Sequence, residues 1–260
     1  MAEIAVFVFG LVLGSFANVI VLRLNTGESL IFGGSRCFFC GRALKWFELI
    51  PVISFFALRA KCRNCGSKIS WQYPAVELVS GLLFLILYLQ AQPNFKFLIF
   101  NFETASFAAV ILFFWLLLVI SVYDIRHKII PDHLVYSAIV VALLFLFLGI
   151  GILDLLPSIF SGLGLFAFFA TLWLVSRGRW MGFGDAKLGL ALGLILGWPE
   201  ALAAVLFSFW AGAIAGIFWV FFARLKNLKV QIPFAPFLFI GGLTAFLLGE
   251  RIISWYFGLI

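Results

Sequence analysis

Long apolar runs without charged residues alternate with shorter polar segments along most of this chain. A helix needs about 20 apolar residues to cross the hydrocarbon layer of a membrane, and seven runs approach or exceed that length. They cover residues 4–22, 78–95, 105–123, 134–153, 155–176, 201–223 and 230–249. A shorter run, 188–199, predicts a further span that either extends back through Gly182 to Lys187 or is partly re-entrant. The pattern predicts an all-α polytopic membrane protein with about eight transmembrane helices, the short one being the sixth.

The composition supports a membrane protein and excludes several other classes. The chain is 65% hydrophobic and 11% charged, whereas soluble domains are about half apolar and about a quarter charged. Its 34 Phe and 9 Trp residues would leave large exposed patches unless lipid covered them. A soluble, a disordered or a secreted disulfide-stapled protein is therefore excluded.

The basic residues predict how the helices are oriented. The first apolar run follows Glu3 directly, and the first basic residue, Arg23, comes after it, so we expect no cleavable signal peptide and an N-terminus outside the cytoplasm. With eight crossings, every Lys and Arg except Lys96 and Arg251 falls in a cytoplasmic loop, as the positive-inside rule requires. The net charge of +7 therefore indicates topology rather than a nucleic-acid-binding surface.

One sizeable polar stretch, between the first two predicted helices, holds all four cysteines. They form two C-x-x-C-G motifs, a spacing typical of zinc ribbons, and comprise Cys37, Cys40, Cys62 and Cys65. Four thiolates can converge tetrahedrally, and the glycine that follows each pair lets the backbone fold back toward the sulfur. In the reducing cytosol a metal site is favoured over a disulfide. We expect structural Zn²⁺ rather than the alternative, a redox dithiol pair, because four Cys ligands leave no open coordination position.

These features divide the chain into three predicted segments. Residues 1–24 form the first transmembrane helix, 25–73 form a cytoplasmic four-Cys domain resembling a zinc ribbon, and 74–260 form the membrane helical domain.

Two acidic residues fall at predicted cytoplasmic ends of transmembrane helices. Asp124 directly follows the run 105–123, and Asp185 lies between the fifth and sixth runs. Each could be a solvated helix end, or the two carboxylates could face one another at matched depth. Nearby carboxylates cannot easily both ionise, so one keeps a proton while the other acts as a base on water. Such a pair predicts aspartic-protease chemistry.

The residues around Asp185 are unusually small. Glycines on either side of Phe183 would let a substrate strand or another helix approach the backbone closely. Three further glycines at four-residue spacing predict a flat helix face that packs tightly and holds Asp185 against a neighbour. The two sets are Gly182 and Gly184, then Gly189, Gly193 and Gly197.

Other polar residues near these acids have simpler interpretations. Asp132 is a competing partner, but an Asp that follows Pro131 and precedes an apolar run is a good helix N-cap. His127 and His133 lack regular ligand spacing and are predicted to be surface residues.

In its motifs the chain resembles the bacterial type IV prepilin peptidases, which belong to the GxGD membrane aspartic proteases. That family removes the leader of type IV prepilins and type II secretion pseudopilins and then methylates the new N-terminus. The matching segments are Gly14–Val19, the two Cys pairs, Leu58–Cys62, Ile69–Leu78, Asp124 with Ile130–Asp132, Gly182–Leu188 and Pro233–Phe237. Two positions depart from the family pattern, because Phe38 stands where Pro is common and Ala235 where Gly is usual.

The resemblance implies roles for individual residues. It makes Asp124 and Asp185 the catalytic pair and leaves Asp132 out. It also implies S-adenosylmethionine as methyl donor, with Asn18 and Glu77 as the polar residues that match its motifs. Glu77 is equally well explained as a helix-start acid favoured by the helix dipole, and the chain has no glycine-rich dinucleotide fingerprint.

The resemblance further implies a multi-pass protein of the bacterial inner membrane, with the four-Cys domain and the active site on the cytoplasmic side. Its expected partners are prepilin and pseudopilin substrates and the lipid bilayer, and no nucleic acid. One alternative is a presenilin-like intramembrane protease without methylation, since Tyr123–Asp124 and Gly182–Asp185 also fit that group, although the four-Cys domain argues against it. The other is a proton-coupled transporter or assembly scaffold, for which the sequence lacks a convincing internal repeat.

Overall fold

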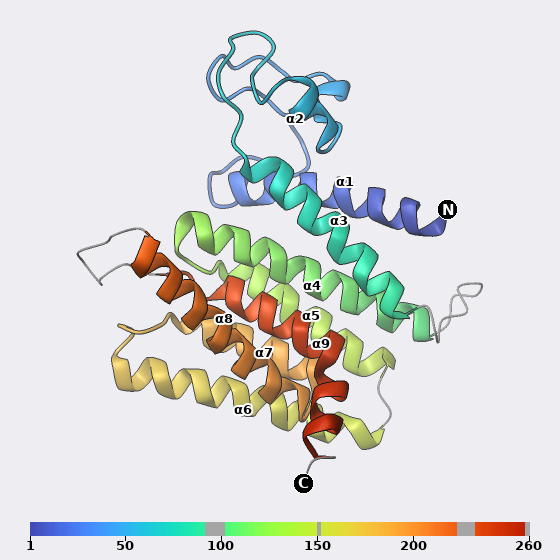
Figure 1. The fold of residues 1–260 in the computed structure, drawn as a ribbon, viewed down its shortest axis with the longest axis vertical. Helices are drawn as coiled ribbons and strands as arrows, with labels where there is room; N and C mark the ends of the chain where they lie inside the picture. Colours follow the sequence, from blue (N-terminus) through green and yellow to red (C-terminus); the bar gives the residue numbers. More distant parts are fainter. Residues whose placement is uncertain (92–101, 150–151, 223–231, 258–260) are drawn as a thin grey trace. The chain divides into compact units, whose positions relative to one another are not determined.

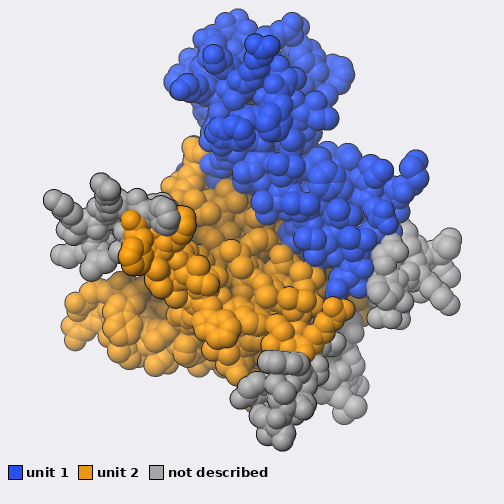
Figure 2. All heavy atoms as spheres, viewed as in Figure 1, with its two compact units in different colours: residues 1–95 blue, residues 96–260 orange. Residues whose placement is uncertain are grey.

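The computed structural model of the chain describes residues 1–91, 102–149, 152–222 and 232–257. Its long elements are all helical (Figure 1), and the described residues contain two isolated β-bridges but no sheet. The chain forms two compact units, residues 1–95 and 96–260, which Figure 2 distinguishes by colour. The predicted all-α fold is confirmed.

The first unit consists of two long helices joined through the four-Cys segment. Helices α1 (Ala2–Arg23) and α3 (Gln72–Ala91) pack against each other, and the short elements η1 (Trp46–Leu49) and α2 (Ile53–Ala57) lie in the connection. This unit therefore includes α3, most of which the sequence-based division had grouped with the later helices at 74–260.

Small residues bring α1 and α3 into close contact. A β-carbon on Gly10 would lie 2.9 Å from Gly81 Cα, and one on Gly14 would lie 2.6 Å from Glu77 Cα. The Ser80 hydroxyl donates a hydrogen bond to Gly10 O at 2.7 Å. The spacing of Gly10 and Gly14 is the small-xxx-small pattern of packed transmembrane helices, a signal that the sequence reading did not use.

The second unit is a helical bundle. Its members are α4 (Phe102–His127), α5 (Asp132–Gly149), α6 (Ile152–Ser176), α7 (Phe183–Leu196), α8 (Glu200–Phe222) and α9 (Ala235–Phe257). Helix α4 packs against α5 and α9, α8 packs against α9, and α7 contacts α5, α6, α8 and α9. Figure 1 shows α7 among these helices rather than at the edge of the bundle. Buried side chains from α4, α7 and α9 supply much of the core.

The predicted glycine face of α7 packs against α6. A β-carbon on Gly189 would lie 2.6 Å from Phe169 Cδ2, and one on Gly193 would lie 2.7 Å from Gly162 Cα. Gly197 is the C-cap of α7, with φ of 70°, and lies beyond the last helical turn. The packing function of Gly189 and Gly193 is confirmed, whereas Gly197 ends the helix.

Among the residues that the structure describes, five helices are long and apolar enough to cross a membrane: α1, α3, α4, α6 and α8. Two shorter apolar helices lie within α5 and α9. Helix α7 begins at Phe183, so the sixth predicted run extends back as in the first of the two alternatives, yet its 14 residues reach only about 21 Å. The number of crossings, eight, stays a prediction.

Some predicted features lie outside the described residues. They are positions 92–95, 150–151, 223 and 230–231 of the apolar runs, Lys96, and the basic residues Arg224, Lys226 and Lys229.

Candidate active site

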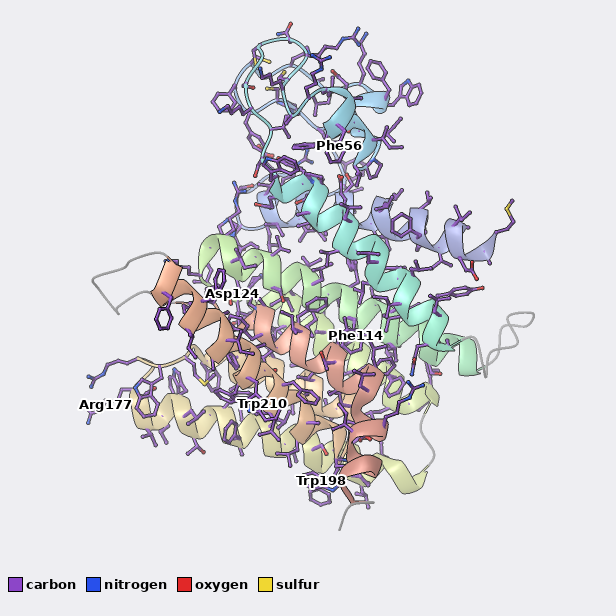
Figure 3. The ribbon with its side chains drawn as sticks, in the orientation of Figure 1. Phe56, Phe114, Asp124, Arg177, Trp198 and Trp210 are labelled. Carbon is purple, nitrogen blue, oxygen red and sulfur yellow. The ribbon has the colours of Figure 1, made fainter. Side chains whose placement is uncertain are left out.

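Asp124 is buried near the end of α4, where it binds the start of α9 (Figure 3). Its Oδ2 atom accepts a hydrogen bond from Ala235 N at 3.2 Å. Ala235 is the first residue of α9, so its N–H has no partner within that helix. One turn earlier on α4, the Ser121 hydroxyl donates to Ala235 O at 3.1 Å and to Leu117 O at 2.7 Å. Two side chains of α4 therefore hold both backbone polar groups of one residue.

Asp185 is also buried, and it too binds a helix start. It is the third residue of α7, and its Oδ2 atom accepts a hydrogen bond from Gly182 N at 3.0 Å. The first N–H groups of a helix have no partner within it, so they are available to a side-chain oxygen. The position of Asp185 is thus set by the way in which α7 begins.

Both candidate carboxyl groups lie in the second unit. Each is 5% exposed, and they are close enough to interact electrostatically. Asp185 Oδ1 is buried without a hydrogen-bond partner among the described residues. An unpartnered buried oxygen is unfavourable when the group is charged. The site therefore offers a polar atom that is free to bind a reacting group.

Asp132 takes no part in this pair. Its Oδ1 atom forms an ion pair with Lys187 Nζ at 2.6 Å, and Asp132 is exposed. Leu134 and Val135 donate their N–H groups to Pro131 O, so α5 begins at Asp132 itself. The expected N-cap role is therefore wrong, because Asp132 already has helical conformation and Pro131 precedes the helix. The ion pair instead joins the start of α5 to the first turns of α7.

Because Gly184 has no side chain, another part of the protein can pack directly against it. A β-carbon there would lie 2.8 Å from Ile130 Cβ, which belongs to the connection between α4 and α5. At Gly182 the nearest atom to an added β-carbon is Asp185 Oδ2, at 3.6 Å. Of the two glycines, Gly182 is exposed and leaves the backbone accessible, whereas Gly184 lets a neighbouring loop pack on α7.

Sequence reasoning missed Ser121 and the backbone of Ala235 as parts of this site. Ser121 is a polar residue within the apolar run that ends at Asp124, three residues before it. That position was a signal of a specific partner, but the partner lies 114 residues away. At Ala235 the backbone makes the bonds, so the presence of Ala in place of the usual Gly leaves them intact.

The first unit carries a second candidate site, formed by the four cysteines. Their sulfur atoms all lie within 4.8 Å of one another, and Cys37 Sγ lies 3.8 Å from Cys65 Sγ. With metal–sulfur bonds of about 2.3 Å, a tetrahedral site requires sulfur separations of about 3.8 Å. The donor set therefore fits a metal ion. Among the described residues, these four cysteines form the one cluster of at least three His, Cys, Asp or Glu side chains that could hold a metal ion.

The two cysteine turns have the same backbone design. Gly41 N donates to Cys37 O and Gly66 N donates to Cys62 O, each at 2.9 Å. Gly41 has φ of 69° and Gly66 has φ of 70°, a left-handed conformation that favours glycine. The predicted reason for the glycine after each pair is confirmed.

The protein environment favours the thiolate at two of the four cysteines, whereas burial and contacts with the neighbouring sulfur atoms raise the pKa of the Cys62 thiol. Backbone N–H groups of Cys40 and Phe39 lower the pKa of the Cys37 thiol to about 6. The Ser67 hydroxyl and N–H lower the pKa of the Cys65 thiol. Metal ions bind the thiolate form, so the surroundings of Cys37 and Cys65 favour a bound cation.

A partly buried ion pair stabilises the segment between the two cysteine turns. The Glu48 carboxylate binds the Arg42 guanidinium and accepts a hydrogen bond from Lys45 N at 2.8 Å. The Lys45 N–H and the Arg42 charge hold the pKa of Glu48 below its ordinary value of 4.5.

Asn18 and Glu77 are both buried in the first unit, where their polar atoms form hydrogen bonds with other residues of the protein. Asn18 Nδ2 donates to Gly14 O at 3.3 Å and to Tyr73 O at 3.2 Å. Glu77 Oε2 accepts a hydrogen bond from Val52 N at 2.7 Å. These contacts join α1 and the four-Cys segment to α3.

Comparisons with known proteins agree with the two-unit organisation. A sequence model of the bacterial peptidase A24 N-terminal domain matches residues 8–91, and that of the type IV leader peptidase family matches residues 111–217. No solved structure matches the chain.

Curated relatives are similar over almost the whole length. A prepilin leader peptidase/N-methyltransferase from Bacillus subtilis (strain 168) is 35% identical, with 96% of each chain covered. A protein of the same name from Aeromonas hydrophila is 31% identical, covering 96% of this chain and 92% of the relative. Another, from Pseudomonas aeruginosa, is 32% identical, covering 95% and 90%. With this similarity and both matching domains, the chain belongs to the type IV leader peptidase family.

Proposed function

We propose that this protein is a membrane aspartic endopeptidase that removes the leader of type IV prepilins and N-methylates the new N-terminus, with type II pseudopilins as further substrates. The observation that carries the peptidase proposal is the buried pair Asp124 and Asp185 within one helical unit. Family membership and the names of the relatives support the substrate class.

The hydrogen bonds support different roles for the two acids. The buried, unpartnered Oδ1 of Asp185 favours a protonated carboxyl there, since an ionised group would leave that charge unpaired. Asp124 then acts as the base. It takes a proton from a water molecule whose oxygen attacks the scissile carbonyl, while Asp185 gives its proton to the carbonyl oxygen. Collapse of the tetrahedral intermediate breaks the C–N bond and returns a proton to the leaving amine.

The four-Cys cluster fits structural Zn²⁺, held by Cys37, Cys40, Cys62 and Cys65. Bound Zn²⁺ would supply cross-links between the two turns, because four thiolates leave no open position for catalysis. Replacing Cys62 with Ser should lower both the metal content and the resistance of this segment to protease. An unchanged zinc stoichiometry in purified C62S would exclude the site.

S-adenosylmethionine is the methyl donor that we propose for the second reaction, and the first unit is its proposed binding region. Asn18 and Glu77 are candidate residues there. Because their polar atoms bind the protein, we expect them to shape the region rather than to present free ligating groups.

We further propose that the protein lies in the bacterial inner membrane with the four-Cys segment and the active site on the cytoplasmic side. The distribution of basic residues between the predicted loops supports this orientation. Cysteine-accessibility labelling of the four-Cys segment in intact and permeabilised cells would test it.

The deciding experiment for the peptidase compares three variants in proteoliposomes with a prepilin substrate. D124N and D185N should each abolish cleavage, since either removes the acid or the base. D132N should retain most activity, because an exposed ion pair contributes only about 0–1 kcal/mol. Cleavage by D124N or D185N would refute the assignment.

A labelled methyl donor in the same assay separates the alternatives. Cleavage with label supports the bifunctional enzyme, and cleavage without label supports a presenilin-like protease. Neither reaction would favour a transporter or scaffold.

A further inference from the structure

A strained turn in the first unit is attached to a membrane-spanning helix. Val52 has φ of 62° and ψ of −52°, and Ile53 N donates to Pro51 O at 2.6 Å. This is a γ-turn of the rare, strained type, and a β-branched residue at its centre is an outlier. Val52 N donates to Glu77 Oε2 at 2.7 Å. Glu77 therefore holds the turn in a conformation that Val would otherwise avoid.

The attachment point sets the depth of the turn. Helix α3 is long and apolar enough to cross a membrane, and it begins at Gln72. Glu77 comes five residues later, about 7.5 Å along the helix axis. Interfacial helices lie about 5–10 Å into the boundary between head groups and acyl chains. With the membrane surface placed at the start of α3, the turn and α2 directly after it lie at the level of that boundary.

Helix α2 presents apolar side chains at this level. Ile53 is 66% exposed and Phe56 is 57% exposed, whereas Phe55 is buried. Trp71, just before α3, is 66% exposed, and its ring lies 4.8 Å from that of Phe55 and 6.2 Å from that of Phe56. Figure 3 shows Phe56 on the part of the four-Cys segment nearer to α3. Trp residues at the ends of transmembrane helices are typical of the membrane–water interface.

The charges next to α2 match a lipid surface. Arg59 and Lys61 follow the helix and are exposed, and cationic side chains close to a membrane are attracted to anionic head groups. Apolar side chains flanked by such residues are typical of helices that lie in the interface.

We propose that α2 and Trp71 form a membrane-interface surface, which inserts into the head-group region of an anionic bilayer at a depth fixed by Glu77. This surface binds lipid rather than a protein. It would hold the four-Cys segment at a defined height above the membrane.

Photo-crosslinking of the full-length protein tests this proposal. The photoreactive residue p-benzoylphenylalanine is placed at position 56, and the protein is reconstituted in liposomes of phosphatidylglycerol and phosphatidylcholine in equal parts. After irradiation, mass spectrometry should find a phospholipid adduct at this position. The matched control carries the same residue at Phe39, an aromatic position that is 78% exposed in the first cysteine turn, and should give no lipid adduct. Equal lipid labelling at the two positions would overturn the proposal, as would an adduct from position 56 to protein.

Variants of Glu77 test the attachment. E77A removes the acceptor for Val52 N and should abolish the lipid adduct at position 56, while E77Q keeps an acceptor oxygen and should preserve it. An unchanged adduct in E77A would show that Glu77 does not set the depth. The same label at Ile53, which is also exposed on α2, provides a second position if the first variant is not produced in folded form.

Discussion

Gly193 lies on α7 about 12 Å along the helix axis from Asp185, yet we expect its replacement by Ala to impair the candidate catalytic carboxylates. A β-carbon there would lie 2.7 Å from Gly162 Cα and 2.7 Å from Ser161 O. Both atoms belong to the backbone of α6, so no side chain can rotate away. Restoring ordinary contact requires α6 and α7 to separate by roughly 1 Å, since interiors of this kind are close-packed.

Two opposing contributions set the change in stability of G193A, and the displacement of Asp185 sets the change in activity. Overpacking destabilises a folded protein by about 1–3 kcal/mol, and Ala gains about 1 kcal/mol over Gly in a helix. The net loss of stability should therefore be small. Asp185 lies on the same helix, however, and moves with it. A 1 Å displacement of a catalytic group can lower activity by about 10²-fold, so kcat/KM for prepilin cleavage should fall by between about tenfold and a hundredfold.

Cleavage kinetics in proteoliposomes, together with thermal unfolding, would measure both quantities. Gly164→Ala is the matched control, because Gly164 is also on α6 and a β-carbon there meets nothing within 4 Å. It should keep kcat/KM within about twofold and raise stability slightly. If G193A cleaves as fast as G164A, then Asp185 is not positioned by the glycine contact.

Three further predictions concern single groups. Ser121→Ala removes the hydroxyl bond to the start of α9, worth about 1 kcal/mol, and should lower kcat/KM about fivefold; S121T should restore it, and unchanged kinetics in S121A would contradict the role. Gly41→Ala forces a β-carbon into a left-handed turn at about 1 kcal/mol and should weaken Zn²⁺ binding in a competition titration, whereas the control Gly34→Ala should bind normally. The Lys45 N–H lowers the pKa of folded Glu48. The ionised Glu48 carboxylate therefore stabilises the four-Cys segment fully above pH 4.5, and this contribution is lost as the pH falls through the folded pKa. Limited proteolysis from pH 7 to pH 3 should show this loss, and E48Q should lack that pH dependence.

Sequence patterns predicted best the features that depend on neighbouring residues. The cysteine turns follow from C-x-x-C-G, because two cysteines and a left-handed glycine define each turn locally. Long helices such as α4 were predictable because an uncharged run of about 20 residues has few alternatives in a membrane.

The start of α7 was harder to locate, since charged residues normally indicate the end of a membrane helix. Asp185 and Lys187 both fall within its first turns. Asp185 is accommodated by the Gly182 N–H and Lys187 by Asp132, 55 residues away. Partners this distant leave no periodic signal in the sequence, and the same holds for Ser121 with Ala235 and for Val52 with Glu77.

The candidate active site is built from helix ends more than from side-chain networks. Each carboxyl group receives a backbone N–H from a residue at the beginning of a helix, Gly182 for Asp185 and Ala235 for Asp124. Such donors move only when their helix moves, because the backbone has no rotamers. The relative position of the two acids therefore depends on how α4, α7 and α9 pack, and residues such as Gly193 and Ser121 matter because they set that packing. A family pattern that names only the two acids leaves out the contacts that hold them in place.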